Sequence, residues 1–336
     1  MKVHAPGKLI LSGEHAVVYG QPALVMAVNR YATATITREL MPQILLDLAD
    51  LAHHSHFSVA ALRELKDRIK QKYLRFVRGE SRIRDVLHKP FELTQFAISL
   101  FTESLSVSLP HGVNIRVQSD IPIGCGMGSS AATILSVMHA ISTYLQMNLS
   151  VDTLYQLALE AENMQHGHAS GSDLRIAQQG GCLYLYQQRI EPRPIPSLPM
   201  YLINTGTPET TTGQCVEKVS THFQSASLGE EFGAVTKTMD AALQHQEWKT
   251  MQEAIRTNHQ LLTRIGVVPE KVQQFISQIE ALGGAAKVCG AGAIEGDNAG
   301  AVLVICEDPD LLSQLSQRFG YQFTTISAET RGVYAV

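Results

Sequence analysis

The feature that most limits how this chain can fold is the run Gly124-Cys125-Gly126-Met127-Gly128-Ser129-Ser130, which lies between a strand pattern and a helix pattern. Before the run, residues 113–117 alternate between apolar and polar side chains, as a half-buried strand does. After it, apolar residues recur at helical spacing from Ile134 to Leu145. The segment therefore predicts a strand, a tight loop and a helix whose N-terminus faces that loop.

Such a loop is suited to bind an anion such as phosphate. Closely spaced glycines let backbone N–H groups converge, and the start of a helix carries partial positive charge. The loop lacks the Gly-Lys-Ser/Thr ending of a P-loop and the usual dinucleotide-binding pattern. Taken alone, it is equally compatible with a structural turn capped by a serine. The candidate phosphate-binding residues are Gly124, Gly126, Gly128, Ser129 and Ser130.

Length and local composition predict two domains. At 336 residues the chain is longer than a single hydrophobic core usually supports, and 45% of its residues are hydrophobic. Residues 191–199, Glu-Pro-Arg-Pro-Ile-Pro-Ser-Leu-Pro, form its most proline-rich stretch, as is typical of a junction. We therefore predict domains at residues 1–190 and 191–336.

Charge and cysteine content exclude some classes of protein. The formal net charge of −4 disfavours binding to nucleic acid. The five cysteines are odd in number and widely spaced, which predicts reduced thiols rather than a disulfide framework. No signal peptide and no membrane-spanning segment is evident in the sequence, so we expect a cytoplasmic protein without a membrane partner.

Two further segments carry charges that need partners. Lys8 lies in an otherwise apolar strand pattern, and Glu14-His15 follows in a glycine-flanked turn. In isolation these residues fit a solvated lysine and an ordinary loop. Glu162 and Asp173 lie on either side of a turn, with Glu162 off the apolar stripe of its helix. One such carboxylate can hold a divalent cation while the other activates a hydroxyl, although each alone is more often a surface acid.

Two other patterns carry less information. His166, His168 and the histidines of residues 53–56 lack an evident third ligand, so we reject a zinc site and expect residues 53–56 to form a solvated loop. The glycine-rich segment Gly290–Gly300 lies between two strand patterns. Its small residues would let a ligand approach closely, but an ordinary glycine-rich connection would look the same.

The order of these elements along the chain resembles the GHMP small-molecule kinases. The segments Ala5-Pro6-Gly7-Lys8 and Gly13-Glu14-His15-Ala16-Val17-Val18-Tyr19-Gly20 are similar to the members that phosphorylate mevalonate. They differ from galactokinases, which typically read Gly-Glu-His-Thr-Asp-Tyr. The resemblance implies an α+β fold with an S5-like N-terminal, nucleotide-binding domain and a ferredoxin-like C-terminal domain. It also implies a left-handed βαβ unit, which is rare.

The resemblance also implies a role for each matching residue. Asp173 would be the catalytic base beside Lys8, Ser130 and Glu162 would bind Mg²⁺, and the glycine loop would hold the triphosphate of ATP. The residues on the substrate side would be Glu14, His15 and Thr211. The implied reaction is ATP-dependent phosphorylation of the primary hydroxyl of mevalonate to 5-phosphomevalonate, in isoprenoid biosynthesis. We also expect a homodimer.

Two departures from the family pattern bear on the substrate. Glu209 follows Pro208 where many relatives that act on mevalonate have arginine, and residues 290–297 read Gly-Ala-Gly-Ala-Ile-Glu-Gly-Asp where they have more consecutive glycines. The alternatives are therefore another GHMP kinase, acting on phosphomevalonate or a sugar, and a catalytically silent sensor of nucleotide and metabolite. The presence of Lys8 and both acids favours an enzyme over the sensor.

Overall fold

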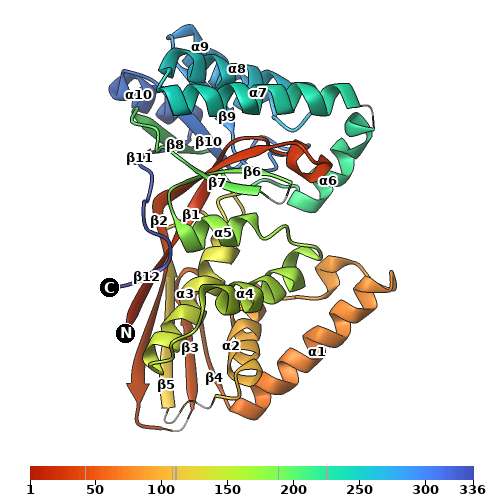
Figure 1. Cartoon of the computed structure of the whole chain (residues 1–336), viewed down its shortest axis with the longest axis vertical. Coiled ribbons are helices and arrows are strands. Elements are labelled where there is room, and N and C mark those ends of the chain that lie inside the picture. The colour runs from red at the N-terminus through yellow and green to blue at the C-terminus, as the bar shows by residue number, and fades with distance from the viewer. Residues whose placement is uncertain (42, 108, 110–111, 188, 225) are drawn as a thin grey trace.

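The computed structural model describes residues 1–41, 43–107, 109, 112–187, 189–224 and 226–336, and within them it has two β-sheets, each with its own helices (Figure 1). The larger sheet has the strand order β12-β1-β2-β5-β3-β4, and β6 pairs with both β2 and β7. The smaller has the order β11-β8-β10-β9. The predicted α+β class is confirmed by this arrangement.

The first sheet is built on two long strands. Its pairings are antiparallel except that of β3 with β5. β1 has a register shift between Pro6 and Gly7 but continues as one strand. The strands are β1 Lys2–Ser12, β2 Ala23–Glu39, β3 Ile44–Leu48, β4 His53–Phe57, β5 Gly112–Ser119, β6 Cys182–Tyr186, β7 Arg189–Arg193 and β12 Tyr334–Ala335.

Helices pack on one side of this sheet, with α3 directly against β1 and β2 (Figure 1). α3 is apolar because it is covered on both sides, by the sheet and by α2 and α4. The outermost helix, α1, packs on α2 and α4 and is mostly exposed. The helices are α1 Val59–Val77, α2 Glu92–Ser104, α3 Ser129–Tyr144, α4 Val151–His166 and α5 Ser172–Gln179.

The second sheet is fully antiparallel and carries the C-terminal helices. Its strands are β8 Met200–Asn204, β9 Ala285–Val288, β10 Ala301–Ile305 and β11 Gln322–Ile326. Its helices are α6 Thr212–Val219, α7 Ala226–His245, α8 Trp248–Arg264, α9 Glu270–Ala281 and α10 Pro309–Phe319. Short 3₁₀ helices occur at Ala16–Tyr19, Ala49–Leu51, Ile83–Asp85 and Ser220–Phe223. None of the helices in the described residues is long and apolar enough to cross a bilayer.

One of the buried apolar clusters extends across both halves. Leu9 and Leu11 of β1 belong to the same buried cluster as Leu243 of α7 and Ile255 of α8. The chain also crosses between the halves, since β12 returns to pair with β1. The domain boundary predicted between residues 190 and 191 falls within strand β7, and it stays a prediction.

One local expectation was wrong. Residues 53–56, expected to form a loop, lie in strand β4 and pair with β3. The ring of His53 stacks on that of Phe91, with 3.6 Å between their centroids. Pairing with a buried neighbour strand has overridden the polar composition that suggested a loop.

Candidate active site

The glycine-serine loop is held against β1. The backbone N–H of Lys8 donates to the carbonyl oxygen of Met127 at 2.9 Å. Gly128, the residue before α3, is left-handed with φ of 72°. A β-carbon at Gly128 would lie 3.1 Å from Cγ of Lys8 and 3.5 Å from Oδ2 of Asp173. The loop therefore passes directly beside both charged side chains, at a left-handed position that favours glycine.

Lys8 and Asp173, which are far apart in the sequence, form an ion pair. Their Nζ and Oδ1 atoms are 3.3 Å apart, and the side chains are 6% and 34% exposed. Asp173 lies in the first turn of α5, which begins after the left-handed Gly171. The pair thus combines a buried cation with a carboxylate that solvent or a substrate can reach.

Glu162 and Ser130 form a second polar contact. Ser130 Oγ donates to Oε1 of Glu162 at 2.9 Å. Glu162 is buried, with 4% of its surface exposed, so the expectation that it lies off the buried side of α4 was wrong. α3 packs on α4 and covers this position. Oε2 of Glu162 is buried without a hydrogen-bond partner in the described residues, which is the kind of atom that a cation would satisfy.

His166 is a further charged group at this place. Its Nε2 lies 3.4 Å from Oε1 of Glu162, and its side chain is 40% exposed. Burial acts to lower the pKa of His166, but the hydrogen bond and charge of Glu162 outweigh it and raise that pKa. The sequence suggested His166 only as a rejected zinc ligand. Its spacing of one helical turn from Glu162 is the sequence signal by which this contact could have been found.

Glu14 and His15 are tied to the C-terminal sheet. Glu14 is 1% exposed and forms an ion pair with Lys287 of β9, and its burial raises its pKa. His15 Nε2 lies 3.0 Å from the carbonyl oxygen of Ala291, while burial lowers the pKa of His15 to about 4. Sequence reasoning missed Lys287, although a lysine within an apolar strand pattern was the signal that had identified Lys8.

Thr211 lies at the start of α6. Its side chain accepts from the backbone N–H of Gln214 at 3.3 Å and donates to Oε1 of Gln214 at 2.9 Å, and the residue is exposed. Its neighbour Thr210 is the threonine that faces the glycine-rich C-terminal segment, because Oγ1 of Thr210 accepts from the N–H of Ile294 at 3.3 Å. The substrate role of Thr211 stays a prediction.

The two glycine-rich segments pack backbone to backbone. A β-carbon at Gly126 would lie 3.0 Å from the carbonyl oxygen of Cys289 and 3.1 Å from Cα of Gly290. Glu209 reaches the second segment as well, since a β-carbon at Gly296 would lie 2.6 Å from its Oε1. The two departures from the family pattern, at Glu209 and in residues 290–297, are therefore in contact with each other.

Comparisons with known proteins agree with this arrangement. Residues 92–181 match the family described as GHMP kinases N terminal domain. The mevalonate kinase of Archaeoglobus fulgidus is 29% identical over 294 residues, covering 87% of this chain and 89% of that protein. The mevalonate kinase of Pyrococcus horikoshii is 27% identical over 299 residues, covering 86% and 84%.

A solved structure extends the likeness to the whole fold. The Methanococcus jannaschii mevalonate kinase superposes with a TM-score of 0.83 at 22% identity, covering 98% of both chains. The fold class predicted from the sequence is therefore confirmed, including its two-domain architecture. Residues 92–181 of this chain thus match the N-terminal domain of the GHMP kinases, and relatives named mevalonate kinase match it along most of its length.

Proposed function

We propose that the chain transfers the terminal phosphoryl group of ATP to the primary hydroxyl of mevalonate, giving 5-phosphomevalonate and ADP. The observation that carries this proposal is the ion pair of Lys8 and Asp173 beside Gly128, next to the contact of Ser130 with Glu162. The mevalonate kinases named above match most of this chain and most of their own length, which favours mevalonate as the acceptor.

The residues act on the reaction as follows. Asp173 accepts the proton of the acceptor hydroxyl, and the hydroxyl oxygen forms a bond to the γ-phosphorus while the bond from that phosphorus to ADP breaks. Lys8, whose side chain is 6% exposed, places a fixed positive charge beside the transferred group. The amides of residues 124–130 and the N-terminus of α3 bind the phosphates. Glu14, His15 and Thr211 are proposed on the acceptor side.

Ser130 and Glu162 fit a magnesium ion. Both supply oxygen atoms, which Mg²⁺ prefers, and Oε2 of Glu162 has no other partner in the described residues. When bound there, the ion would neutralise charge on the nucleotide phosphates.

A panel of acceptors tests the proposal. ADP formation is measured by a coupled assay with mevalonate, phosphomevalonate, galactose and homoserine, and kcat/KM is compared among them. We expect mevalonate to have the highest value, and Asp173→Asn to reduce it by about 100-fold to 10,000-fold. No turnover with mevalonate would refute the proposal.

The other outcomes identify the alternatives. Preference for phosphomevalonate or a sugar would point to another GHMP kinase, for which the contact of Glu209 with Gly296 is the relevant departure. Binding of ATP without turnover of any acceptor would point to a sensor. A cytoplasmic location and a homodimer stay predictions.

A further inference from the structure

The turn between Glu162 and Asp173 has few anchors of its own. Residues 167–171 connect α4 to α5 and are small apart from His168. Within the segment, Asn163 Oδ1 accepts from the N–H of Ala169 at 2.8 Å, and Ser170 bonds to Ser172. The turn joins the helix that carries the proposed cation ligand, Glu162, to the helix that carries the proposed base, Asp173.

Helix α1 contacts this turn from outside. The hydroxyl of Tyr73 donates to the carbonyl oxygen of Gly167 at 2.6 Å. Among the described residues, this is the one hydrogen bond that reaches residues 167–171 from outside the segment running from α4 to α5. Gly167 is buried and has φ of 80°, and it is the residue at which α4 ends.

An aromatic ring covers the same residue. A β-carbon at Gly167 would lie 2.8 Å from Cζ and 2.9 Å from Cε1 of Phe76, so the ring packs directly on the glycine. The ring centroid of Phe76 is also 6.0 Å from that of His168. Tyr73 and Phe76 therefore hold the turn by one hydrogen bond and one packed ring.

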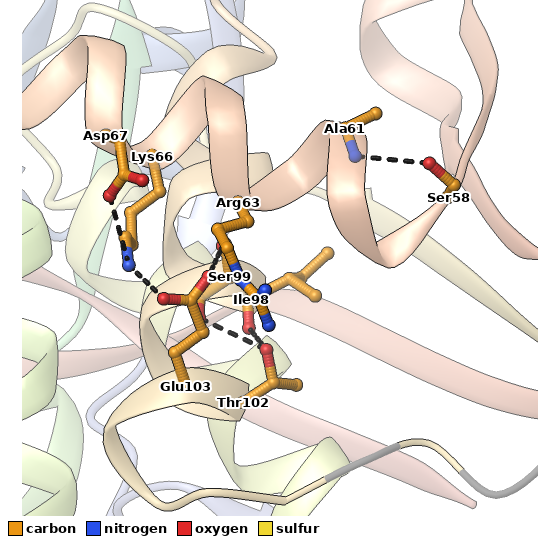
Figure 2. A network of polar contacts seen from close by, with 9 residues as sticks. All are labelled: Ser58, Ala61, Arg63, Lys66, Asp67, Ile98, Ser99, Thr102 and Glu103. Carbon is orange, nitrogen blue, oxygen red and sulfur yellow. Dashed lines mark hydrogen bonds and ion pairs between the residues drawn. The ribbon is translucent and has the colours of Figure 1, made fainter.

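Ion pairs join α1 to α2 and α4, and so hold Tyr73 and Phe76 beside Gly167. Figure 2 shows Lys66 and Arg63 of α1 reaching Glu103 of α2, to which Ser99 also donates. Lys66 is buried, and although burial acts against its charge, Glu103 raises its pKa. Farther along α1, Lys70 Nζ lies 2.7 Å from Glu160 Oε1 of α4 itself.

We propose that Tyr73 is a positioning residue, which holds the turn at Gly167 and thereby sets the distance between Glu162 and Asp173. The inference rests on the proposed function for the roles of these two acids. The family match begins at residue 92, after α1, so it assigns this helix no role. Small displacements of catalytic groups cost large factors in rate, so a single hydrogen bond to the turn matters for turnover.

The test removes the hydroxyl alone. In Tyr73→Phe we expect kcat to fall by about 10-fold, with KM for the acceptor little changed and a higher Mg²⁺ concentration needed for half-maximal activity. In the protein without substrates, hydrogen–deuterium exchange should be faster in a peptide covering residues 162–173 and unchanged elsewhere. Phe76→Leu should also make hydrogen–deuterium exchange faster in this peptide.

A matched control lies on the same helix. Leu74 is 52% exposed, so Leu74→Ala should leave both exchange and kcat unchanged. Unchanged exchange in Tyr73→Phe, or an equal increase across the whole protein, would overturn the inference. Because exchange is measured without substrates, it tests the contact even if mevalonate proves to be the wrong acceptor.

Discussion

Lys287 and Glu14 form an ion pair that is closed to solvent, with side-chain exposures of 0% and 1%. Lys287 Nζ also donates to the carbonyl oxygen of Ile10 at 3.0 Å. One cation on the second sheet therefore holds the end of β1, the strand that carries Lys8, together with the loop that carries His15. The geometry of the proposed active site depends on this contact between the halves of the molecule.

Removing this cation should destabilise the protein strongly. In Lys287→Met the carboxylate of Glu14 loses its buried partner, so we expect the free energy of unfolding to fall by about 3–5 kcal/mol, measured by urea denaturation. The double variant Lys287→Met/Glu14→Gln should recover part of the loss. Lys249, an exposed lysine of α8, is the control, and Lys249→Met should change the free energy by less than about 0.5 kcal/mol. Equal effects of the two lysine substitutions would contradict the prediction.

Glu162 should determine the requirement for magnesium. In Glu162→Gln we expect the Mg²⁺ concentration for half-maximal activity to rise by about 10-fold or more, since a neutral amide replaces the one carboxylate proposed as a ligand. The measurement is a Mg²⁺ titration of the initial rate at saturating ATP. Asp152→Asn, which changes an exposed acid on the same helix, should leave the titration unchanged. A Glu162→Gln curve that overlays the wild type would exclude Glu162 as a ligand.

Alanine substitution at Gly128 should affect activity, whereas substitution at a left-handed glycine with open space around it should affect only stability. Gly128 and Gly79 have nearly equal φ of 72° and 75°, but a β-carbon at Gly79 meets nothing within 4 Å. Alanine at either position should cost about 1 kcal/mol of stability through backbone strain. We expect only Gly128→Ala to lower kcat as well, by about 10-fold or more, because its methyl group would press on Lys8. Equal activity of both variants would show that this close approach is unimportant for catalysis.

Two buried histidines should make stability depend on pH. Burial lowers the pKa of His15 and of His259 to about 4. In the unfolded chain a histidine titrates near about 6.5, so between about pH 6.5 and pH 4 the unfolded state binds protons that the folded state does not. The free energy of unfolding should therefore fall as pH is lowered through this window and be restored above it.

The size of this effect is best measured by comparison. Each histidine should account for about 2 kcal/mol of the loss at about pH 5. We therefore compare the wild type with His259→Gln. The raised pKa of Glu14 makes stability rise as pH falls, but both proteins contain Glu14, so its effect cancels in the comparison. Urea denaturation across this pH range should give a shallower decline for the variant. Parallel curves would show that His259 does not carry the expected dependence.

Local patterns predicted much of the fold. Alternation at residues 113–117 located β5, and helical spacing from Ile134 to Leu145 located α3, because these signals depend on nearby residues. Helices α7 and α8 are separated by a break at Gln246, where φ is 58°. No glycine or proline marks this break, so no local pattern predicts it.

Contacts across the molecule were harder to foresee. The burial of Glu162 depends on α3 packing over α4, and the strand at residues 53–56 depends on pairing with β3. Lys287 became recognisable only beside Glu14. The proximity of Lys8 to Asp173 was expected from the family resemblance alone, since nothing local in the sequence joins the two segments.

The pairing of β12 with β1 has a consequence for how the protein is made. Val3 lies opposite Ala335, from the other end of the chain, and the N–H of Val336 donates to the carbonyl oxygen of Lys2. During synthesis on the ribosome, this edge of β1 has no partner until β12 leaves the exit tunnel. An exposed strand edge invites pairing with other chains, so the nascent protein is most at risk of aggregation while translation is still under way.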